Sequence, residues 1–193
     1  TDAYENDAEL DIDYIFAGAV NQDAQHLVNK EVARLASLRK DCMAFVSPGA
    51  SLATAKLLDN ASYRSGVTAA EAARDAIGNN SYTFVDSGWK YMYDKYNDIN
   101  RWVPLNPDTA GIVARTENNQ DAWVSPAGNQ RGSYQNIIKL SINPSKSERD
   151  RLYQKQINPV VTFPGEGTML FGDRTAVTRP GSFDRINVRK LFI

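Results

Sequence analysis

The chain has 193 residues, of which 42% are hydrophobic and 10% aromatic, and its formal net charge is −1 at pH 7. This composition is typical of a globular protein with enough apolar residues for a sizeable core, and it excludes an intrinsically disordered chain. No apolar run approaches the ~20 residues that span a bilayer, and the absence of a dense basic run argues against a nucleic-acid-binding protein.

The two ends of the chain differ in charge. Residues 1–13 contain six acidic residues and no basic residue, whereas residues 101–193 contain 13 basic and 8 acidic residues. One interpretation is a solvated acidic terminus on a nearly neutral domain. The other is that oppositely charged regions of neighbouring copies meet, because complementary charges fix the orientation of partners.

The first residues of the chain and its single cysteine bear on export and on disulfide formation. The chain begins at Thr1 with neither an initiator methionine nor a basic and then apolar signal region, so we expect a piece of a longer chain that is made without export. Its single cysteine, Cys42, excludes an internal disulfide and lies in an apolar run, which indicates a buried and inert thiol.

A strand–helix–strand pattern lies near the start of the chain. Residues 14–18 and residues 42–46 are apolar runs that each predict a short buried strand. Between them, apolar side chains recur on one face of a helix that Asn21 can cap and that runs to about Lys40. Two such strands joined by an amphipathic helix form a βαβ unit, in which the strands are parallel.

Two more helices are expected before residue 80. Residues 51–59 predict a short helix. Thr68 and Glu71 have the spacing of a capping box, in which each side chain accepts a hydrogen bond from the other residue's free backbone N–H. The sequence therefore predicts a helix that begins at Thr68 and ends at Gly78, since glycine favours the residue after a helix.

The middle of the chain predicts a β-hairpin. Residues 82–85 and 89–93 are rich in aromatic and β-branched side chains, which favour strands. A polar turn at residues 97–100 separates the second run from residues 101–104. We therefore expect residues 89–93 and 101–104 to pair.

Two further helices are indicated by their first residues. Asn106 followed by Pro107 predicts a capped helix over residues 106–116. Ser145 and Glu148 repeat the capping-box spacing and predict a helix that runs to about Gln156.

The last strands surround this final helix. The β-branched residues of segment 134–142 predict one strand. Residues 160–163 and 169–171 predict a pair across the turn at residues 164–167, and the stretch from Phe183 fits a helix or an extended segment equally well.

These elements define the expected fold class. Strands mixed with helices indicate an α/β (α+β mixed) fold: a mixed β-sheet with flanking helices that includes a βαβ unit. A boundary near residue 100 would divide residues 1–100, which contain the βαβ unit, from residues 101–193, although one continuous domain fits the pattern as well.

The residues that carry chemistry form no recognisable site. His26 is the only histidine, so a zinc site with several histidines is excluded, and no Gly-x-Ser-x-Gly turn presents a serine to it. Gly165-Glu-Gly167 lacks the lysine and the following helix of a phosphate-binding loop. We therefore expect no catalytic residues, no metal, no cofactor and no enzymatic activity.

Several short blocks in the second half of the chain occur in the order that is known from one protein family. The blocks are WVPLNP at 102–107, AGIVART at 110–116, WVSPA at 123–127, DRLY at 150–153, INPV at 157–160, GDRT at 172–175 and INVRKLF at 186–192. In this order the chain resembles the tail sheath protein of contractile-tailed bacteriophages. The first hundred residues resemble it more loosely, through the βαβ unit.

The resemblance implies a mechanical role. Sheath subunits polymerise as a helical tube around an inner tail tube, and on a baseplate signal the sheath contracts and drives the tube through the host envelope during genome ejection. The implied partners are other sheath copies, the tail tube, and the baseplate and tail terminator proteins, with neither nucleic acid nor membrane. The implied location is the tail sheath of the virion, after synthesis in the host cytoplasm.

The chain also departs from the family pattern at its end. Sheath proteins commonly carry two arginines before the Leu-Phe pair, whereas this chain has Arg189 and Lys190. The family continues past this point into an extended arm, so the resemblance implies the folded middle of a subunit without its linking arms, monomeric by itself. Arg185, Arg189 and Lys190 are the candidate inter-subunit contacts. The alternative is that they cap the last carbonyls of a helix or pair with Asp184 inside their own subunit.

Two other functions stay open at this point. One is a small-molecule-binding or hydrolytic α/β domain with its ligand beyond the strand at residues 42–46, near Ser47-Pro-Gly49, because ligands bind at the carboxyl ends of parallel strands. The other is the sheath of a related bacterial contractile injection system. The phage form of the blocks over residues 102–116 favours the virus.

Overall fold

The computed structural model describes residues 2–6, 9–19, 25–49, 63–179 and 187. The helices are α1 (Asp2–Glu5), α2 (Gln25–Arg39), α4 (Tyr63–Ile77), α5 (Asn106–Asn119) and α6 (Lys146–Gln154). The strands are β1 (Tyr14–Phe16), β2 (Met43–Val46), β3 (Asn80–Val85), β4 (Trp89–Asp94), β5 (Ile99–Pro104), β6 (Lys139–Leu140), β7 (Val160–Phe163), β8 (Gly167–Leu170) and β9 (Thr175–Ala176).

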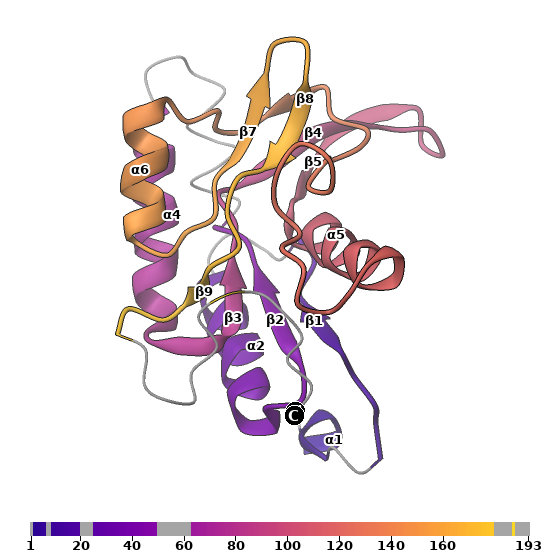
Figure 1. The fold of residues 1–193 in the computed structure, drawn as a ribbon, viewed down its shortest axis with the longest axis vertical. Helices are drawn as coiled ribbons and strands as arrows, with labels where there is room; N and C mark the ends of the chain where they lie inside the picture. Colours follow the sequence, from indigo (N-terminus) through magenta and orange to yellow (C-terminus); the bar gives the residue numbers. More distant parts are fainter. Residues whose placement is uncertain (1, 7–8, 20–24, 50–62, 180–186, 188–193) are drawn as a thin grey trace.

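A four-stranded mixed sheet forms the centre of the molecule (Figure 1). Its strand order is β1-β2-β3-β9, in which β1, β2 and β3 are parallel and β9 is antiparallel to β3. Smaller sheets with the orders β5-β4-β6 and β7-β8 adjoin it. The predicted βαβ unit is confirmed, because β1 pairs with β2 in parallel and α2 lies between them in the chain.

The two faces of this sheet bury different side chains because successive residues of a strand point to opposite faces. Phe45 and Phe84 belong to the cluster that includes residues of α5. Ala44 and Val46, on the alternate positions of β2, belong to the clusters that contact α2 and α4. All four residues of β2 are buried, which explains its continuous apolar run.

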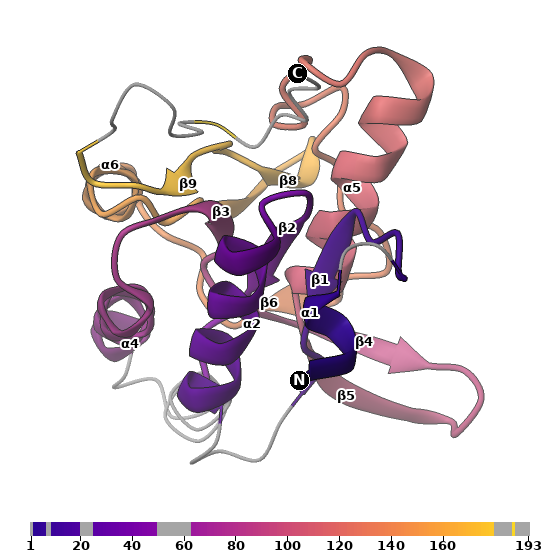
Figure 2. The ribbon, with the colours of Figure 1, turned by 90° about the horizontal axis from the view of Figure 1, so that it is seen from below.

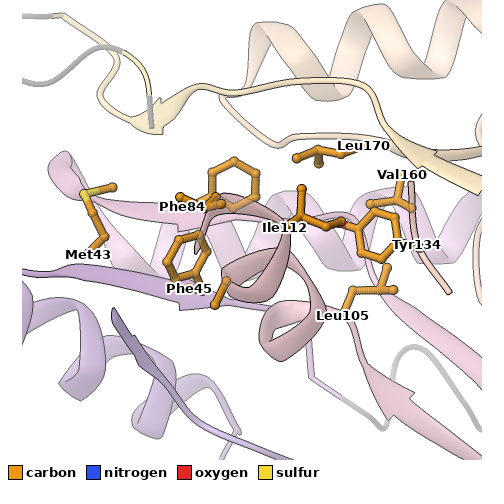
Figure 3. Packing of buried hydrophobic residues seen from close by; sticks show 10 residues of the cluster. Met43, Phe45, Phe84, Leu105, Ile112, Tyr134, Val160 and Leu170 are labelled. Atoms are coloured by element: carbon orange, nitrogen blue, oxygen red, sulfur yellow. The ribbon is translucent and has the colours of Figure 1, made fainter. Parts of the chain in front are cut away.

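The main core joins the two halves of the chain (Figure 3). The rings of Phe45 and Phe84 lie 5.6 Å apart, centroid to centroid. Around them pack Leu105, Ile112, Tyr134, Val160 and Leu170, all of which come from the second half. The Tyr134 hydroxyl forms a hydrogen bond inside this core with Thr109 Oγ1, at 2.7 Å.

The predicted β-hairpin is confirmed as β4 and β5. Its register runs from Trp89 opposite Pro104 to Asp94 opposite Ile99. On one face, the rings of Tyr91 and Trp102 lie 5.0 Å apart, and this cross-strand aromatic pair stabilises the hairpin. The tip projects away from the body of the molecule (Figures 1 and 2).

The capping box predicted at Thr68 is wrong. Helix α4 begins earlier, at Tyr63, so Thr68 lies inside the helix. The carboxylate of Glu71 instead accepts hydrogen bonds from Arg151 of α6, at 2.6 Å and 2.5 Å. Only the first turn of a helix has free backbone N–H groups for a cap to satisfy, so a residue inside the helix cannot cap it. The predicted end of the helix is confirmed, since Gly78 has a φ of +77°.

The predicted cap at Asn106 is also wrong. Leu105 occupies the N-cap position without a side-chain hydrogen bond, and the helix runs to Asn119. The Asn106 amide instead donates to the carbonyl oxygens of Ala17 at 2.6 Å and Phe45 at 3.3 Å. Asn106 is thus buried as a link between α5 and the central sheet.

The strand predicted at residues 134–142 is largely wrong. Only Lys139–Leu140 forms a strand, β6, which pairs with β4. Tyr134 turns into the core, and Asn136 has a φ of +54°, a left-handed conformation that interrupts a strand.

The last predicted helix and hairpin are confirmed. Ser145 caps α6, and its backbone N–H donates to the Glu148 carboxylate at 2.9 Å. Strands β7 and β8 pair across a turn in which Gly165 and Gly167 have φ values of +83° and +88°. The helix predicted at residues 51–59 lies outside the described residues, as does the stretch from Phe183 apart from Asn187, which forms an antiparallel bridge with Arg174.

Candidate functional site

The two residues best suited to catalysis are not placed for it. His26 is exposed on α2. Cys42 is buried, and its burial raises the pKa of the thiol to about 11, so it stays protonated at neutral pH. In the described ranges no three His, Cys, Asp or Glu side chains are grouped to hold a metal ion. No helix in those ranges has the length and apolar content to cross a membrane.

At the carboxyl end of β2, where a ligand would sit in an α/β domain, the described polar groups form hydrogen bonds with one another. Ser47 Oγ donates to the Asp86 carboxylate at 2.7 Å and accepts from the backbone N–H of Asn106 at 3.0 Å. The indole of Trp89 donates to the carbonyl of Pro48 at 2.7 Å. This network ties β2, β3, β4 and α5 together, and it does not favour the small-molecule alternative.

Asp86 is the least expected member of this network. Its side chain is fully buried, and that burial raises the pKa of the carboxyl to about 8. Hydrogen bonds from Ser47 and from the backbone N–H of Gly88 oppose the shift, and the nearby charge of Asp108 adds to it. The hydrogen bonds that Asp86 forms go to a hydroxyl and a backbone N–H rather than to a second acid or base, so we assign it to the structure of the domain.

A second buried polar centre explains two of the sequence blocks. Asn158 of the INPV block accepts from the Arg174 backbone N–H at 2.8 Å and donates to the Arg174 carbonyl at 2.8 Å. Its amide also donates to the Val85 carbonyl at 3.0 Å. A Cβ on Gly172 would lie 2.7 Å from Asn158 Oδ1. The GDRT block therefore needs glycine at this position so that the two segments can approach.

The acidic start of the chain is held by one buried arginine. Arg39 donates to the carbonyl oxygens of Tyr4 at 2.9 Å and Leu10 at 2.6 Å, and it pairs with Asp41 at 2.7 Å. The Arg39 side chain is 0% exposed. The backbone of the N-terminal segment is therefore fixed on α2, with the side chains of Glu9 and Asp11 exposed.

A pocket with basic and aromatic walls lies between α6 and the β7–β8 hairpin. Its volume is about 370 Å³. It is lined by Lys146, Arg149, Asp150, Tyr153, Pro159 and Phe171. The guanidinium carbon of Arg149 lies 5.3 Å from the ring centroid of Phe163 and 5.2 Å from that of Phe171. Phe171 is 50% exposed. The arrangement suits contact with a surface that carries both acidic and apolar groups.

The predicted inter-subunit residues are not placed by the structure. Arg185, Arg189 and Lys190 lie outside the described residues. Arg149 and Phe171 are not among the residues that the sequence predicted. A signal was present, because Phe163 and Phe171 flank the hairpin turn and basic residues lie on α6, but their proximity depends on how α6 packs.

The described residues thus form a mixed α/β domain with a hydrogen-bonded polar network at the carboxyl end of β2 and a basic, aromatic pocket on its surface beside α6. Residues 1–176 match the family described as the phage tail sheath protein central domain. The chain is 41% identical over 201 residues to the tail sheath protein of Enterobacteria phage T4, an alignment that covers 99% of this chain and 30% of that protein. It is 44% identical over 164 residues to that of Vibrio phage KVP40, covering 81% of this chain and 24% of that protein. The chain belongs to the phage tail sheath protein family.

Solved structures show the same fold at low sequence identity. A chain of the anti-feeding prophage baseplate has a TM-score of 0.66 at 15% identity, and the match covers 93% of this chain and 42% of that one. A sheath chain of an extracellular contractile injection system, PVC, in the contracted state has a TM-score of 0.64 at 17% identity, with coverage of 89% and 42%. The expected tail-sheath-like mixed α/β fold is therefore confirmed.

Proposed function

We propose that the chain is part of the structural subunit of a contractile phage tail sheath, which polymerises helically around the tail tube and contracts to drive the tube through the host envelope during genome ejection. The observation that carries this proposal is the family match over residues 1–176. The chain spans about 30% of the T4 relative's length, so polymerisation and contraction are proposed for the whole subunit of which this chain is a part. The relatives are structural sheath proteins, which are not enzymes.

The architecture suits a subunit that moves as a rigid body. Contraction requires contacts between subunits to rearrange while each domain keeps its shape. The core that joins Phe45 and Phe84 to Ile112 and Leu170, together with the buried Asp86 network, supports such rigidity. No nucleotide or cofactor is required, because the energy of contraction would be stored in the assembled lattice.

The two proposed parts of the chain would move together. Residues 1–100 contain the βαβ unit, and residues 101–193 contain the C-terminal part of the sheath core. Support for one continuous domain comes from the shared core and from the pairing of β3 with β9, which joins residues about a hundred positions apart.

The proposed partners follow from the same role. They are other sheath copies, the tail tube, and the baseplate and tail terminator proteins, without nucleic acid or membrane. Synthesis in the host cytoplasm would precede assembly into the virion. We further propose that Arg185, Arg189 and Lys190 contact acidic surface on a neighbouring copy, a proposal supported by the charge difference between the two ends of the chain.

The sheath of a bacterial injection system is the second candidate, because such sheaths share the fold. The identities of 41% and 44% to phage proteins, against 17% to the injection-system sheath, favour the phage. Electron microscopy of the full-length protein tests the proposal. Hollow, helically striated tubes are expected, and a protein that stays monomeric at all concentrations and salt conditions would contradict a sheath function.

A further inference from the structure

The basic and aromatic pocket on α6 has unsatisfied charge. Within the described part of the chain, neither the Lys146 nor the Arg149 side chain forms an ion pair with a carboxylate. The one acid in the lining is Asp150. Arg149 is positioned by the rings of Phe163 and Phe171, so its guanidinium is held at the pocket without a carboxylate. A pocket of this kind favours a carboxylate next to an apolar group.

The N-terminal segment carries the complementary pattern. Leu10 is 39% exposed and stands between the exposed acids Glu9 and Asp11. The bonds from Arg39 to the carbonyls of Tyr4 and Leu10 hold this segment in place. Because its backbone is already ordered, the segment would lose little conformational freedom on binding. We call residues 9–11 the acidic ridge.

The ridge and the pocket lie at opposite ends of the molecule. In Figure 1, α1 and the segment that follows it lie at the lower end, whereas α6 and the β7–β8 hairpin lie at the upper end. Two complementary surfaces at opposite ends produce contacts between different patches of neighbouring copies. Contacts of this type extend into open helical polymers when their rotation does not close a ring.

We infer that the acidic ridge of one copy docks into the α6 pocket of a second copy, with Leu10 against Phe171 and with Glu9 and Asp11 facing Arg149 and Lys146. The inference rests on the proposed sheath function, and it names two surfaces and a partner that the function by itself does not specify. The contact is head to tail, so every subunit in the polymer would use both surfaces.

Charge exchange in the full-length sheath protein tests the pairing. We expect Arg149→Glu and Asp11→Lys each to raise the protein concentration needed for tube formation about tenfold, because each places like charges opposite each other. The double variant restores opposite charges in exchanged positions, and tube formation should return close to the wild-type level. Lys155→Glu is the matched control, since it reverses a charge at the end of α6 next to Asp75 rather than in the pocket.

A second readout does not depend on charge. The double variant Leu10→Cys and Phe171→Cys should form disulfide-linked ladders under oxidising conditions, whereas each single variant should not form ladders. Three results would overturn the inference: assembly of both charge variants as in the wild type, a double charge variant as impaired as the worse single variant, or absence of ladders. If the wild-type protein still forms tubes, these results leave the sheath function intact. A wild-type protein that forms no tubes would overturn the sheath function itself.

Discussion

At the scale of single residues, two buried polar side chains are expected to differ in how the stability of the domain depends on pH. Asp86 and Asn158 lie at adjacent positions across a parallel bridge between two segments of the chain. Asn158 satisfies its amide fully with backbone partners and carries no charge. The Asp86 carboxyl can lose its proton, whereas the Asn158 amide cannot. Only the contribution of Asp86 to stability should therefore depend on pH.

Asp86 should make the stability of the domain depend on pH. Its folded-state pKa of about 8 lies above the unfolded value of about 3.9. The carboxyl therefore contributes fully to stability below pH ~4, and this contribution is lost as the pH rises through 8, with a slope of up to about 1.4 kcal/mol per pH unit. Asp86→Asn should flatten this dependence, as measured by urea unfolding between pH 4 and pH 9. A variant with the wild-type slope would assign the dependence to other groups.

Gly172 should tolerate no side chain. A Cβ there would lie 2.7 Å from Asn158 Oδ1 and 3.1 Å from the Tyr153 ring. We expect Gly172→Ala to lower the free energy of unfolding by about 1–3 kcal/mol, because the segments must separate. Gly111→Ala on α5 is the control, since a methyl group there would meet no atom of another element within 4 Å, and it should be neutral or stabilising. Equal stability of both variants would show that the two segments adapt freely.

Arg189 tests the proposed basic contact at the end of the chain. In the full-length protein, Arg189→Glu should impair tube formation or shift its salt dependence while the subunit stays folded, because a small electrostatic contribution is repeated at every subunit. Arg179→Glu, an exposed charge ten residues earlier, is the control. Wild-type assembly across a range of ionic strengths would contradict the inter-subunit role and favour a role within the subunit, either at a helix end or in a pair with Asp184.

At the scale of the elements, arginines join segments that the sequence leaves separate. Arg151 connects α6 to Glu71 of α4, and Arg39 connects α2 to the N-terminal segment. The Arg39 side chain is 0% exposed, whereas the Arg151 side chain is 58% exposed. Loss of Arg39 should therefore have the larger structural effect.

Arg39→Met should release the N-terminal segment from α2. The variant removes the donors that bind the carbonyls of Tyr4 and Leu10 but keeps an apolar side chain on the helix. We expect faster amide hydrogen exchange in residues 4–11 and a loss of about 1–3 kcal/mol of stability. Arg34→Met is the control, because Arg34 forms exposed ion pairs with Glu5 and Glu31. Unchanged exchange in the Arg39 variant would show that other contacts hold the segment.

At the scale of the whole molecule, we expect assembly to depend on more surface than this chain contains. The chain spans about 30% of the T4 relative, and an ion pair on an exposed surface contributes only about 0.2–1 kcal/mol. We therefore expect residues 1–193 alone to be monomeric at micromolar concentration, as measured by sedimentation at increasing protein concentration. Long polymers of these residues alone would show that the globular faces are sufficient for assembly.

The sequence by itself determined the features that depend on neighbouring residues. The βαβ unit, both hairpins, the Ser145 cap and the helix end at Gly78 follow from periodicity and turn chemistry over a few residues, and the ordered blocks identified the family. The tertiary structure decided where polar side chains find partners. The Asn106 amide donates to the Phe45 carbonyl, and the Glu71 carboxylate accepts from Arg151, so neither residue forms its predicted cap. The side chain of Asp86 is buried. These outcomes depend on residues distant in the chain, which only packing brings within hydrogen-bonding distance.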